Sequence, residues 1–376
     1  MIRTKLLAAL IGLTGLLTAV STQAQDTIKI GEFASLTGKE AAFGQSAHKG
    51  MVLAIDAANT SGGILGKQIE LISEDNQSKP GESSTIAKKL ITRDKVVALL
   101  GEVASSRSLE AAAVAQRYRI PMVSPASTNP KVTEIGDYIF RVCFIDSFQG
   151  AALAKFARED LKVKNVAILR SVSSAYSVGL AKYFKDRFIK DGGTVVIEAS
   201  FSEGDKDFRA QLTSIKAANP DAIFVPGYYT EAALICKQAR DIGLTLPIFG
   251  GDGWEAPALL EIGGAAVEGT YYSTHYSPEA PSETVKAFVR KYKERWGEVP
   301  DAMAALGYDS AIVLMDAIRR AGSTAPAKIR DALATTKNVD GVTGRTTIDA
   351  HRNASKPAVI IEVKNGRFHF VKGVEP

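Results

Sequence analysis

Asp252 is an isolated carboxylate in a loop of glycines, where it could hold a cationic group of a small ligand. Gly250, Gly251 and Gly253 surround it, and the loop follows a short apolar run. Glycines let a ligand approach the backbone closely, and a buried carboxylate needs a charged or hydrogen-bonding partner. The competing interpretation is that Asp252 caps a helix that starts near Ala256, since aspartate is a common N-cap residue. Both interpretations stay open at this point.

Two loops with hydroxyl groups could hold the opposite charge. Ser105 and Ser106 begin a predicted helix after an apolar run, and Thr128 lies in the next loop. Free backbone amides and the helix dipole favour an anion such as a carboxylate at a helix start. Ser105 could instead serve only as an N-cap. With Asp252 facing these hydroxyls, the loops predict a site for a zwitterion and lack the parts of a catalytic centre.

Short apolar strands alternate with amphipathic helices from Thr27 onward. Their aliphatic and β-branched composition is typical of strands covered on both faces, as in parallel sheets. We therefore expect an α/β fold with doubly wound sheets, which bind ligands at the carboxyl ends of their strands. The predicted strands lie at 28–31, 69–73, 96–100, 121–123, 138–142, 166–169, 195–199, 222–225 and 247–249. The predicted helices lie at 44–58, 83–92, 106–118, 148–160, 178–190, 207–218 and 231–242.

The alternating series occurs twice. A helix end, a proline, an apolar strand and a loop of small residues surround Pro121, and the same order returns around Pro247, 126 residues later. The strand-to-loop junction at 99–103 has a counterpart at 224–228. Two similar halves that face each other form a cleft, and clefts bind ligands. The loops after the two copies differ, so the two walls of the cleft should be chemically unlike.

Beyond residue 272 the alternation stops. Two long helices are predicted at 282–296 and 303–321, followed by a turn-rich stretch at 340–349. A hairpin is predicted at 358–371 around Asn365-Gly366, a strong turn pair. Neither segment is long enough for a further domain, so each should return to one of the halves, and the crossings should form a hinge.

The first residues predict export. Arg3 and Lys5 precede an apolar run at 6–20, followed by small residues that suit cleavage, so 1–24 reads as a secretory signal peptide. The run is short for a membrane span. The formal charge of +5 is spread over 376 residues without a basic block, which argues against a nucleic-acid partner. A soluble protein of the periplasm follows.

Other chemistry finds little support. The stretch 251–256 fits a dinucleotide-binding pattern, but it ends its α/β series instead of opening it, so an oxidoreductase is a minor alternative. The four histidines lie outside the candidate loops: His48, His275, His351 and His369. We therefore predict no metal site, no cofactor and no catalytic residue. Cys143 and Cys236 are expected to be buried and unpaired.

Ordered motifs extend over the whole mature chain: Ile30-Gly31, Leu36-Thr37-Gly38, Phe43-Gly44, Gly62-Gly63-Ile64, Ser105-Ser106, Pro125-Ala126-Ser127-Thr128, Tyr176, Gly227-Tyr228, Gln238-Ala239-Arg240 and Gly251-Asp252-Gly253. In order and spacing the sequence resembles the leucine/isoleucine/valine-binding proteins, solute receptors of branched-chain amino acid ABC transporters. The resemblance implies a type I periplasmic binding protein, with two doubly wound parallel-sheet lobes joined by a three-stranded hinge. One lobe would contain 25–143 and 275–349, and the other 144–274 and 350–376.

The resemblance also assigns roles in the site. Ser105 and Thr128 would hold a ligand carboxylate, with backbone amides and the Tyr228 hydroxyl. The Ala126 carbonyl and Asp252 would hold an ammonium. The side-chain pocket would be lined by Phe43, Val103, Ala104, Tyr176 and Met303, and the predicted ligand-binding set also includes Ser106 and Ser127.

Some positions depart from the family. Phe43 stands where relatives usually have tyrosine or tryptophan, Asp252 replaces a common glutamate, and Met303 replaces an aromatic residue. Amino-acid binding is therefore expected, but the preferred side chain is left open. Cysteines that some relatives pair in the first lobe are absent.

The predicted function is capture of a branched-chain or other hydrophobic amino acid by lobe closure, followed by delivery to the membrane permease of an ABC importer. The receptor is expected to be a monomer. A receptor for an amide, a urea or an aromatic acid is an alternative, in which the ligand has no ammonium for Asp252. A sensory ligand-binding protein is another.

Overall fold

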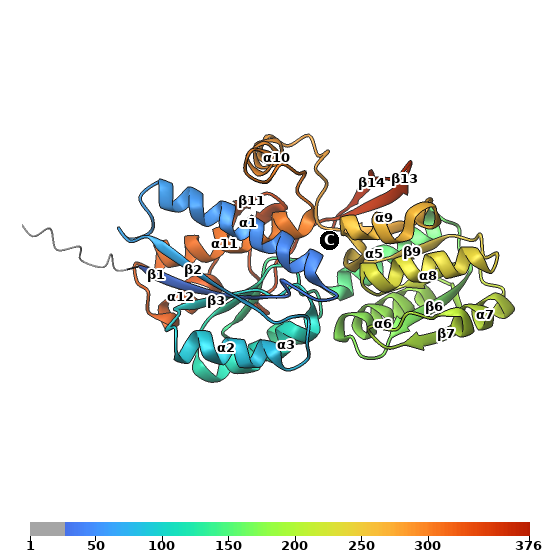
Figure 1. Ribbon diagram of the computed structural model, residues 1–376, viewed down its shortest axis with the longest axis horizontal. Helices are drawn as coiled ribbons and strands as arrows, with labels where there is room; N and C mark the ends of the chain where they lie inside the picture. Colours follow the sequence, from blue (N-terminus) through green and yellow to red (C-terminus); the bar gives the residue numbers. More distant parts are fainter. Residues whose placement is uncertain (1–26) are drawn as a thin grey trace, which may run out of the picture.

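Two α/β lobes lie side by side in the computed structural model, which describes residues 27–376 (Figure 1). The predicted signal peptide at 1–24 lies outside the described residues. Within 27–376, no helix is long and apolar enough to cross a membrane. Cys143 and Cys236 are buried and unpaired, as predicted.

The first lobe is built on a five-stranded parallel sheet with the order β2-β1-β3-β4-β5. Its central strands are aliphatic and fully buried, as expected for strands covered by helices on both faces. The strands are β1 (Ile28–Ala34), β2 (Ile69–Asp75), β3 (Ala98–Leu100), β4 (Met122–Ser124) and β5 (Ile139–Arg141). The helices between them are α1 (Ala41–Thr60), α2 (Glu82–Thr92), α3 (Ser105–Tyr118) and α4 (Lys131–Glu134).

Helices from the end of the chain return to this lobe. α11 (Ala302–Ala321) packs along α1, with α10 (Glu283–Trp296) and α12 (Pro326–Ala334) beside it. Two glycines allow the close approach of α1 and α11. A Cβ on Gly50 would lie 1.9 Å from the Ala304 carbonyl oxygen, and one on Gly307 would lie 2.1 Å from that of Ala47. A side chain at either position would push the helices apart.

The second lobe contains a seven-stranded sheet with the order β14-β13-β10-β9-β8-β6-β7. Its parallel strands are β6 (Asn165–Ser171), β7 (Thr194–Phe201), β8 (Ala222–Val225), β9 (Ile248–Gly250) and β10 (Tyr271–Thr274). The predicted hairpin, β13 (Ala358–Lys364) and β14 (Arg367–Val374), adds to the edge in antiparallel fashion. The helices of this lobe are α5 (Asp146–Glu159), α6 (Ala175–Lys190), α7 (Arg209–Ala218), α8 (Tyr229–Asp241) and α9 (Pro257–Gly263).

The repeat found in the sequence is a repeat of topology. Read from β7, the second sheet has the order β7-β6-β8-β9-β10, which matches β2-β1-β3-β4-β5 strand for strand. β4 begins at Met122 and β9 at Ile248, which reproduces the offset of 126 residues. The loops after β3 and β4 therefore have equivalents after β8 and β9. All four leave carboxyl ends of parallel strands, where such sheets bind ligands.

Three crossings join the lobes: 142–145 between β5 and α5, 275–282 between β10 and α10, and 347–357 between β12 and β13. β11 (Val339–Gly341) and β12 (Gly344–Thr346) form a small antiparallel ribbon. A buried ion pair holds the third crossing to α11, with Lys356 Nζ 3.1 Å from Asp309 Oδ2.

The exact lobe boundaries stay a prediction. Asn353 Oδ1 accepts a hydrogen bond from Thr133 Oγ1 at 3.0 Å, and the Arg352 carbonyl accepts one from Arg141 N at 3.2 Å. These contacts with the first lobe favour a boundary a few residues after 349.

Several short elements, α4 among them, were not predicted from the sequence. β10 has only four residues, and α12 is a nine-residue helix that begins with a proline in its first turn. The ribbon β11–β12 lies within the stretch expected to consist of turns. Short elements such as these have too few residues for a periodic pattern, so tertiary packing decides them.

Candidate functional site

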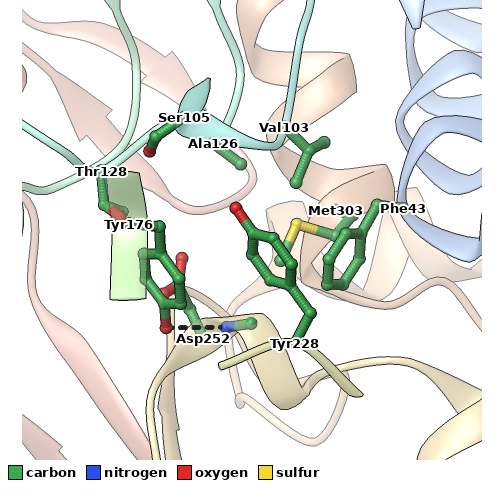
Figure 2. Close-up of a pocket in the computed structure, with 10 residues that line it drawn as sticks. Phe43, Val103, Ser105, Ala126, Thr128, Tyr176, Tyr228, Asp252 and Met303 are labelled. Atoms are coloured by element: carbon green, nitrogen blue, oxygen red, sulfur yellow. Dashed lines mark hydrogen bonds between the residues drawn. The ribbon is translucent and has the colours of Figure 1, made fainter. Parts of the chain in front are cut away.

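The loops at the carboxyl ends of both sheets enclose a small cavity of about 10 Å³ between the lobes (Figure 2). Nine of the twelve predicted ligand-binding residues line it, so the structure brings most of the predicted set together, and their role in binding stays a prediction. The first lobe contributes Phe43, Val103, Ser105, Ala126, Thr128 and Met303, and the second contributes Tyr176, Tyr228, Asp252 and the additional residue Gly253. That space is about the size of one water molecule, so the lining side chains nearly fill the site while the lobes are closed.

The other three predicted residues do not line the cavity. Ala104 is the N-cap of α3, and its amide donates to Glu102 Oε1 at 3.4 Å. Ser106 Oγ accepts a hydrogen bond from Ala175 N at 3.0 Å and so contacts the opposite lobe. Ser127 Oγ lies 2.9 Å from the Glu102 carbonyl oxygen. Neighbours of lining residues point away from the cavity because successive loop side chains face different directions.

Hydroxyl groups form one wall of the cavity. Ser105 is the first residue of α3, not its N-cap, and its Oγ accepts a hydrogen bond from Asn129 N at 3.3 Å. Thr128 Oγ1 lies beside the buried Asp146 carboxylate and the Tyr228 hydroxyl beside Ser174, but neither makes a hydrogen bond of good geometry within residues 27–376. A buried polar group without a partner costs about 1–3 kcal/mol. Both hydroxyls are therefore suited to pair with a ligand.

Asp252 forms part of the opposite wall. It is 3% exposed and begins a 3-10 helix, Asp252–Trp254, while Ala256 is the N-cap of α9, so Asp252 does not cap that helix. Its Oδ1 accepts a hydrogen bond from Gln149 Nε2 at 2.7 Å, and its Oδ2 one from His275 Nε2 at 3.0 Å. His275 Nδ1 has no hydrogen-bond partner among the described residues. Asp252 and His275 therefore do not form a catalytic triad with a serine.

Close packing explains the glycines beside Asp252. A Cβ on Gly251 would lie 2.4 Å from the Tyr176 hydroxyl oxygen, and a Cβ on Gly253 would lie 2.6 Å from the Gly227 carbonyl oxygen. Neither position tolerates a side chain while the tyrosine stays in place. The glycines that make 251–256 resemble a dinucleotide-binding pattern are thus explained by close packing.

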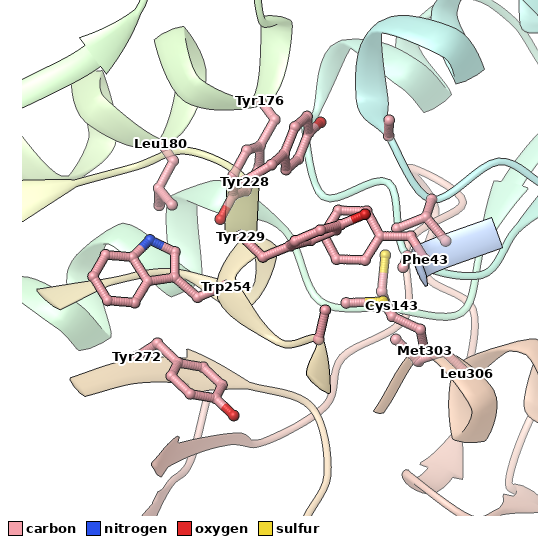
Figure 3. Close-up of a cluster of buried hydrophobic side chains, with 14 of the residues drawn as sticks. Phe43, Cys143, Tyr176, Leu180, Tyr228, Tyr229, Trp254, Tyr272, Met303 and Leu306 are labelled. Carbon is pink, nitrogen blue, oxygen red and sulfur yellow. The ribbon is translucent and has the colours of Figure 1, made fainter. Parts of the chain in front are cut away.

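Aromatic rings from both lobes close the cavity (Figures 2 and 3). Tyr176 stacks on Tyr228 with ring centroids 5.3 Å apart, and Phe43 meets Tyr228 edge to face at 5.5 Å. Burial raises the pKa of Tyr176 and Tyr228 well above its usual value, so both hydroxyls stay protonated. In Figure 2, Met303 lies beside Phe43, away from Ser105 and Thr128. The cavity therefore has a polar end and an apolar end.

Two buried charged residues, both missed by the sequence analysis, hold the loops of the first lobe. Glu102 Oε1 accepts a hydrogen bond from Val103 N at 3.1 Å, and its Oε2 accepts one from Asn76 Nδ2. Burial raises the pKa of Glu102 to about 7. Arg141 on β5 donates to the carbonyl oxygens of Ser127 and Asn129, the latter at 2.8 Å. In the sequence, Arg141 could have been noticed as a single arginine in an otherwise apolar strand.

Direct contacts hold the lobes together around the cavity. The Tyr229 hydroxyl of α8 donates to the Lys39 carbonyl oxygen at 2.8 Å, and Lys39 Nζ lies 3.1 Å from Glu203 Oε2. On the other side, Asn129 Nδ2 donates to the Ala175 carbonyl oxygen at 2.6 Å. The lobes are thus closed on the site.

The described part of the chain contains no cluster of three or more histidine, cysteine or acidic side chains that could hold a metal ion. The chemistry of the site comes instead from hydroxyls, one carboxylate and apolar rings. Such a set can bind and orient a small polar molecule.

Comparisons with known proteins agree with this geometry. The Brucella melitensis protein "Leu/Ile/Val-binding protein homolog 3" is 30% identical over 334 residues, which cover 88% of this chain and 89% of that protein. The leucine-binding protein LivK of Thermotoga maritima has a TM-score of 0.90 at 44% identity, covering 93% of this chain and 99% of that chain.

A second solved structure is similar. The branched-chain amino acid transporter substrate-binding protein LivJ of Streptococcus pneumoniae, in complex with isoleucine, has a TM-score of 0.88 at 37% identity, covering 93% of this chain and all of that chain. A family model described as periplasmic binding protein matches residues 27–367. With its two parallel-sheet lobes and this match, the chain belongs to the periplasmic binding protein family, with the type I fold.

Proposed function

We propose that this protein is the solute receptor of an ABC importer and binds a branched-chain or other hydrophobic amino acid between its lobes. The observation that carries the proposal is the unlike chemistry of the two walls. Unpaired hydroxyls of Thr128 and Tyr228 lie on one side, and the Asp252 carboxylate lies on the other. Hydrogen bonds to charged groups are strong in a buried site, so these walls suit the carboxylate and the ammonium of an amino acid.

In the proposed pose, Ser105, Thr128 and Tyr228 donate to the ligand carboxylate. The amides at the start of α3 add the favourable end of the helix dipole. Asp252 and the Ala126 carbonyl accept from the ammonium. An acid without an ammonium would leave Asp252 facing an apolar ring or a carboxylate, which is unfavourable.

The ligand side chain would lie at the apolar end of the cavity, lined by Val103, Phe43 and Met303. The relatives support a side chain of this kind, because one is named a leucine-binding protein and another was solved with isoleucine. Flexible Met303 fills irregular space more readily than an aromatic ring does. We therefore expect this end of the site to hold the side chain of leucine, isoleucine or valine when the lobes close around a ligand.

Transport requires closure, a partner and a location. Ser105 and Thr128 belong to the first lobe and Asp252 to the second, so only a closed receptor satisfies both charges of the ligand. We infer that a monomeric receptor, exported by the signal peptide at 1–24 into the periplasm, hands its ligand to a membrane permease. The family's periplasmic relatives support this inference.

The test is a thermal-shift and calorimetric screen of the mature protein. Its compounds are the common amino acids, small amides, urea and benzoates. A ligand at 100 times its Kd should stabilise the protein by about 2.7 kcal/mol. We expect stabilisation by leucine, isoleucine or valine and none by benzoates. Stabilisation by an amide or a benzoate alone would overturn the amino-acid assignment.

A further inference from the structure

We propose that His275 is a positioning residue that fixes the Asp252 carboxylate toward the ligand ammonium and ties it to the crossings between the lobes. This inference rests on the proposed function and adds a residue to its ammonium site. His275 is fully buried and does not line the cavity, so it would act only through Asp252.

The hydrogen bonds of Asp252 are the first step of the argument. Its carboxylate oxygens accept from two side chains, Oδ1 from Gln149 and Oδ2 from His275, and the Tyr176 hydroxyl lies beside the same carboxylate. Neither donor lines the cavity, whereas Asp252 does. A carboxylate only accepts hydrogen bonds, so the proton of the neutral imidazole is assigned to Nε2. The two donors fix the carboxylate while its remaining lone pairs serve the ligand.

The environment keeps the imidazole neutral. Burial lowers the pKa of His275 below its usual value, and Asp252 opposes this shift. Lys356 is the other charged group that affects the ring, and it lowers the pKa further. A neutral ring donates to Asp252 without cancelling its charge. The carboxylate therefore keeps its attraction for a cation.

The first two crossings hold the His275 ring. The residue itself follows β10 and begins the second crossing. Its ring stacks on Phe144 of the first crossing, with centroids 3.7 Å apart and planes 22° apart. Lys356, from the third crossing, acts on its charge state. The donor to Asp252 is therefore placed by residues of the crossings, which links the ammonium site to the hinge.

The experiment compares leucine affinity by calorimetry in four proteins. His275→Phe keeps an aromatic ring for Phe144 but removes the donor, whereas His275→Gln supplies an amide donor at a similar reach. His351→Phe makes the same change at an exposed histidine and serves as the matched control. We expect His275→Phe to weaken binding about tenfold to a hundredfold, the range for a lost hydrogen bond to a charged group.

The other two variants decide between positioning and packing. His275→Gln should bind within about threefold of the parent, because it restores the hydrogen bond, and the control should be unchanged. Equal losses in His275→Phe and His275→Gln would show a space-filling role and overturn the proposal. Parent-like binding by His275→Phe would overturn it as well.

A second measurement separates this inference from the proposed function and covers a variant that fails to fold. Nitrogen NMR of the parent should show a neutral His275 protonated at Nε2, with its signal shifted in Asp252→Asn. Absence of that tautomer would overturn the positioning role even in a protein that binds leucine. If no amino acid binds the parent, the proposed function fails, whereas the NMR result still decides whether His275 holds Asp252.

Discussion

Replacing Asp252 by asparagine removes the charge that would face the ligand ammonium and keeps the shape of the side chain. Asp252 is 3% exposed, so water cannot easily replace the lost partner. Breaking a buried, hydrogen-bonded charge pair costs about 2–5 kcal/mol, or roughly 30-fold to 4,000-fold in Kd. We expect the lower part of this range, because the asparagine oxygen and the Ala126 carbonyl can still accept from the ammonium.

The assay is calorimetric titration with leucine at neutral pH. Asp241→Asn, at the exposed end of α8, is the matched control and should bind like the parent. Urea unfolding measures stability separately. An asparagine amide turned toward Gln149 or His275 would lose a hydrogen bond, worth about 1–3 kcal/mol. If Asp252→Asn bound leucine within threefold of the parent, Asp252 would not hold the ammonium, and the assignment of the two walls would be refuted.

Tyr228→Phe should weaken leucine binding about tenfold without loss of unfolding free energy. The reason is that it removes a hydroxyl that makes no well-formed hydrogen bond in the described protein. Unchanged affinity in the same titration would contradict this. The Tm in scanning calorimetry should fall from about pH 5 to about pH 8. Burial raises the pKa of Glu40 and Glu255 from 4.5 to about 8, so the folded chain keeps protons that the unfolded chain releases. Glu255→Gln should flatten this decline, and a rising Tm would refute it. Lys356→Met should lower the unfolding free energy in urea by about 3 kcal/mol, because Asp309 stays buried without its cation; a loss below about 1 kcal/mol would show that its other hydrogen bonds suffice.

The parts predicted from the sequence are those that local pattern determines. Short aliphatic runs marked the strands, and the repeat of Pro121 at Pro247 marked the equivalence of β4 and β9. Because ligand sites in such sheets lie at carboxyl ends, the loops could be named before their geometry was known. Thr128 and Asp252 were found in this way. Family resemblance gave Phe43 its role in the side-chain pocket, and in the structure it lies in the first turn of α1.

The supporting residues could not be predicted because their partners are distant in sequence. Gln149 lies 103 positions before Asp252, on a helix with no feature that marks it. His275 follows β10, a strand that the sequence analysis did not identify, so its place behind Asp252 was not foreseeable. Glu102 and Arg141 are charged residues beside apolar strands. Burial of a charge is costly without partners, so such residues indicate a constrained loop even when the partner is unknown.

The duplicated fold explains why binding of one ligand can stabilise the closed arrangement of the two lobes. Equivalent strands β4 and β9 place Thr128 and Asp252 at corresponding carboxyl ends on separate lobes. An amino acid held only by the first lobe would leave its ammonium without the Asp252 carboxylate, and one held only by the second would leave its carboxylate without the Ser105 and Thr128 hydroxyls. The differential contacts that shift a receptor toward its closed state therefore arise only when both lobes engage the same ligand. In the proposed arrangement, His275 links Asp252 to the crossings, which couples ammonium recognition to the geometry of the hinge.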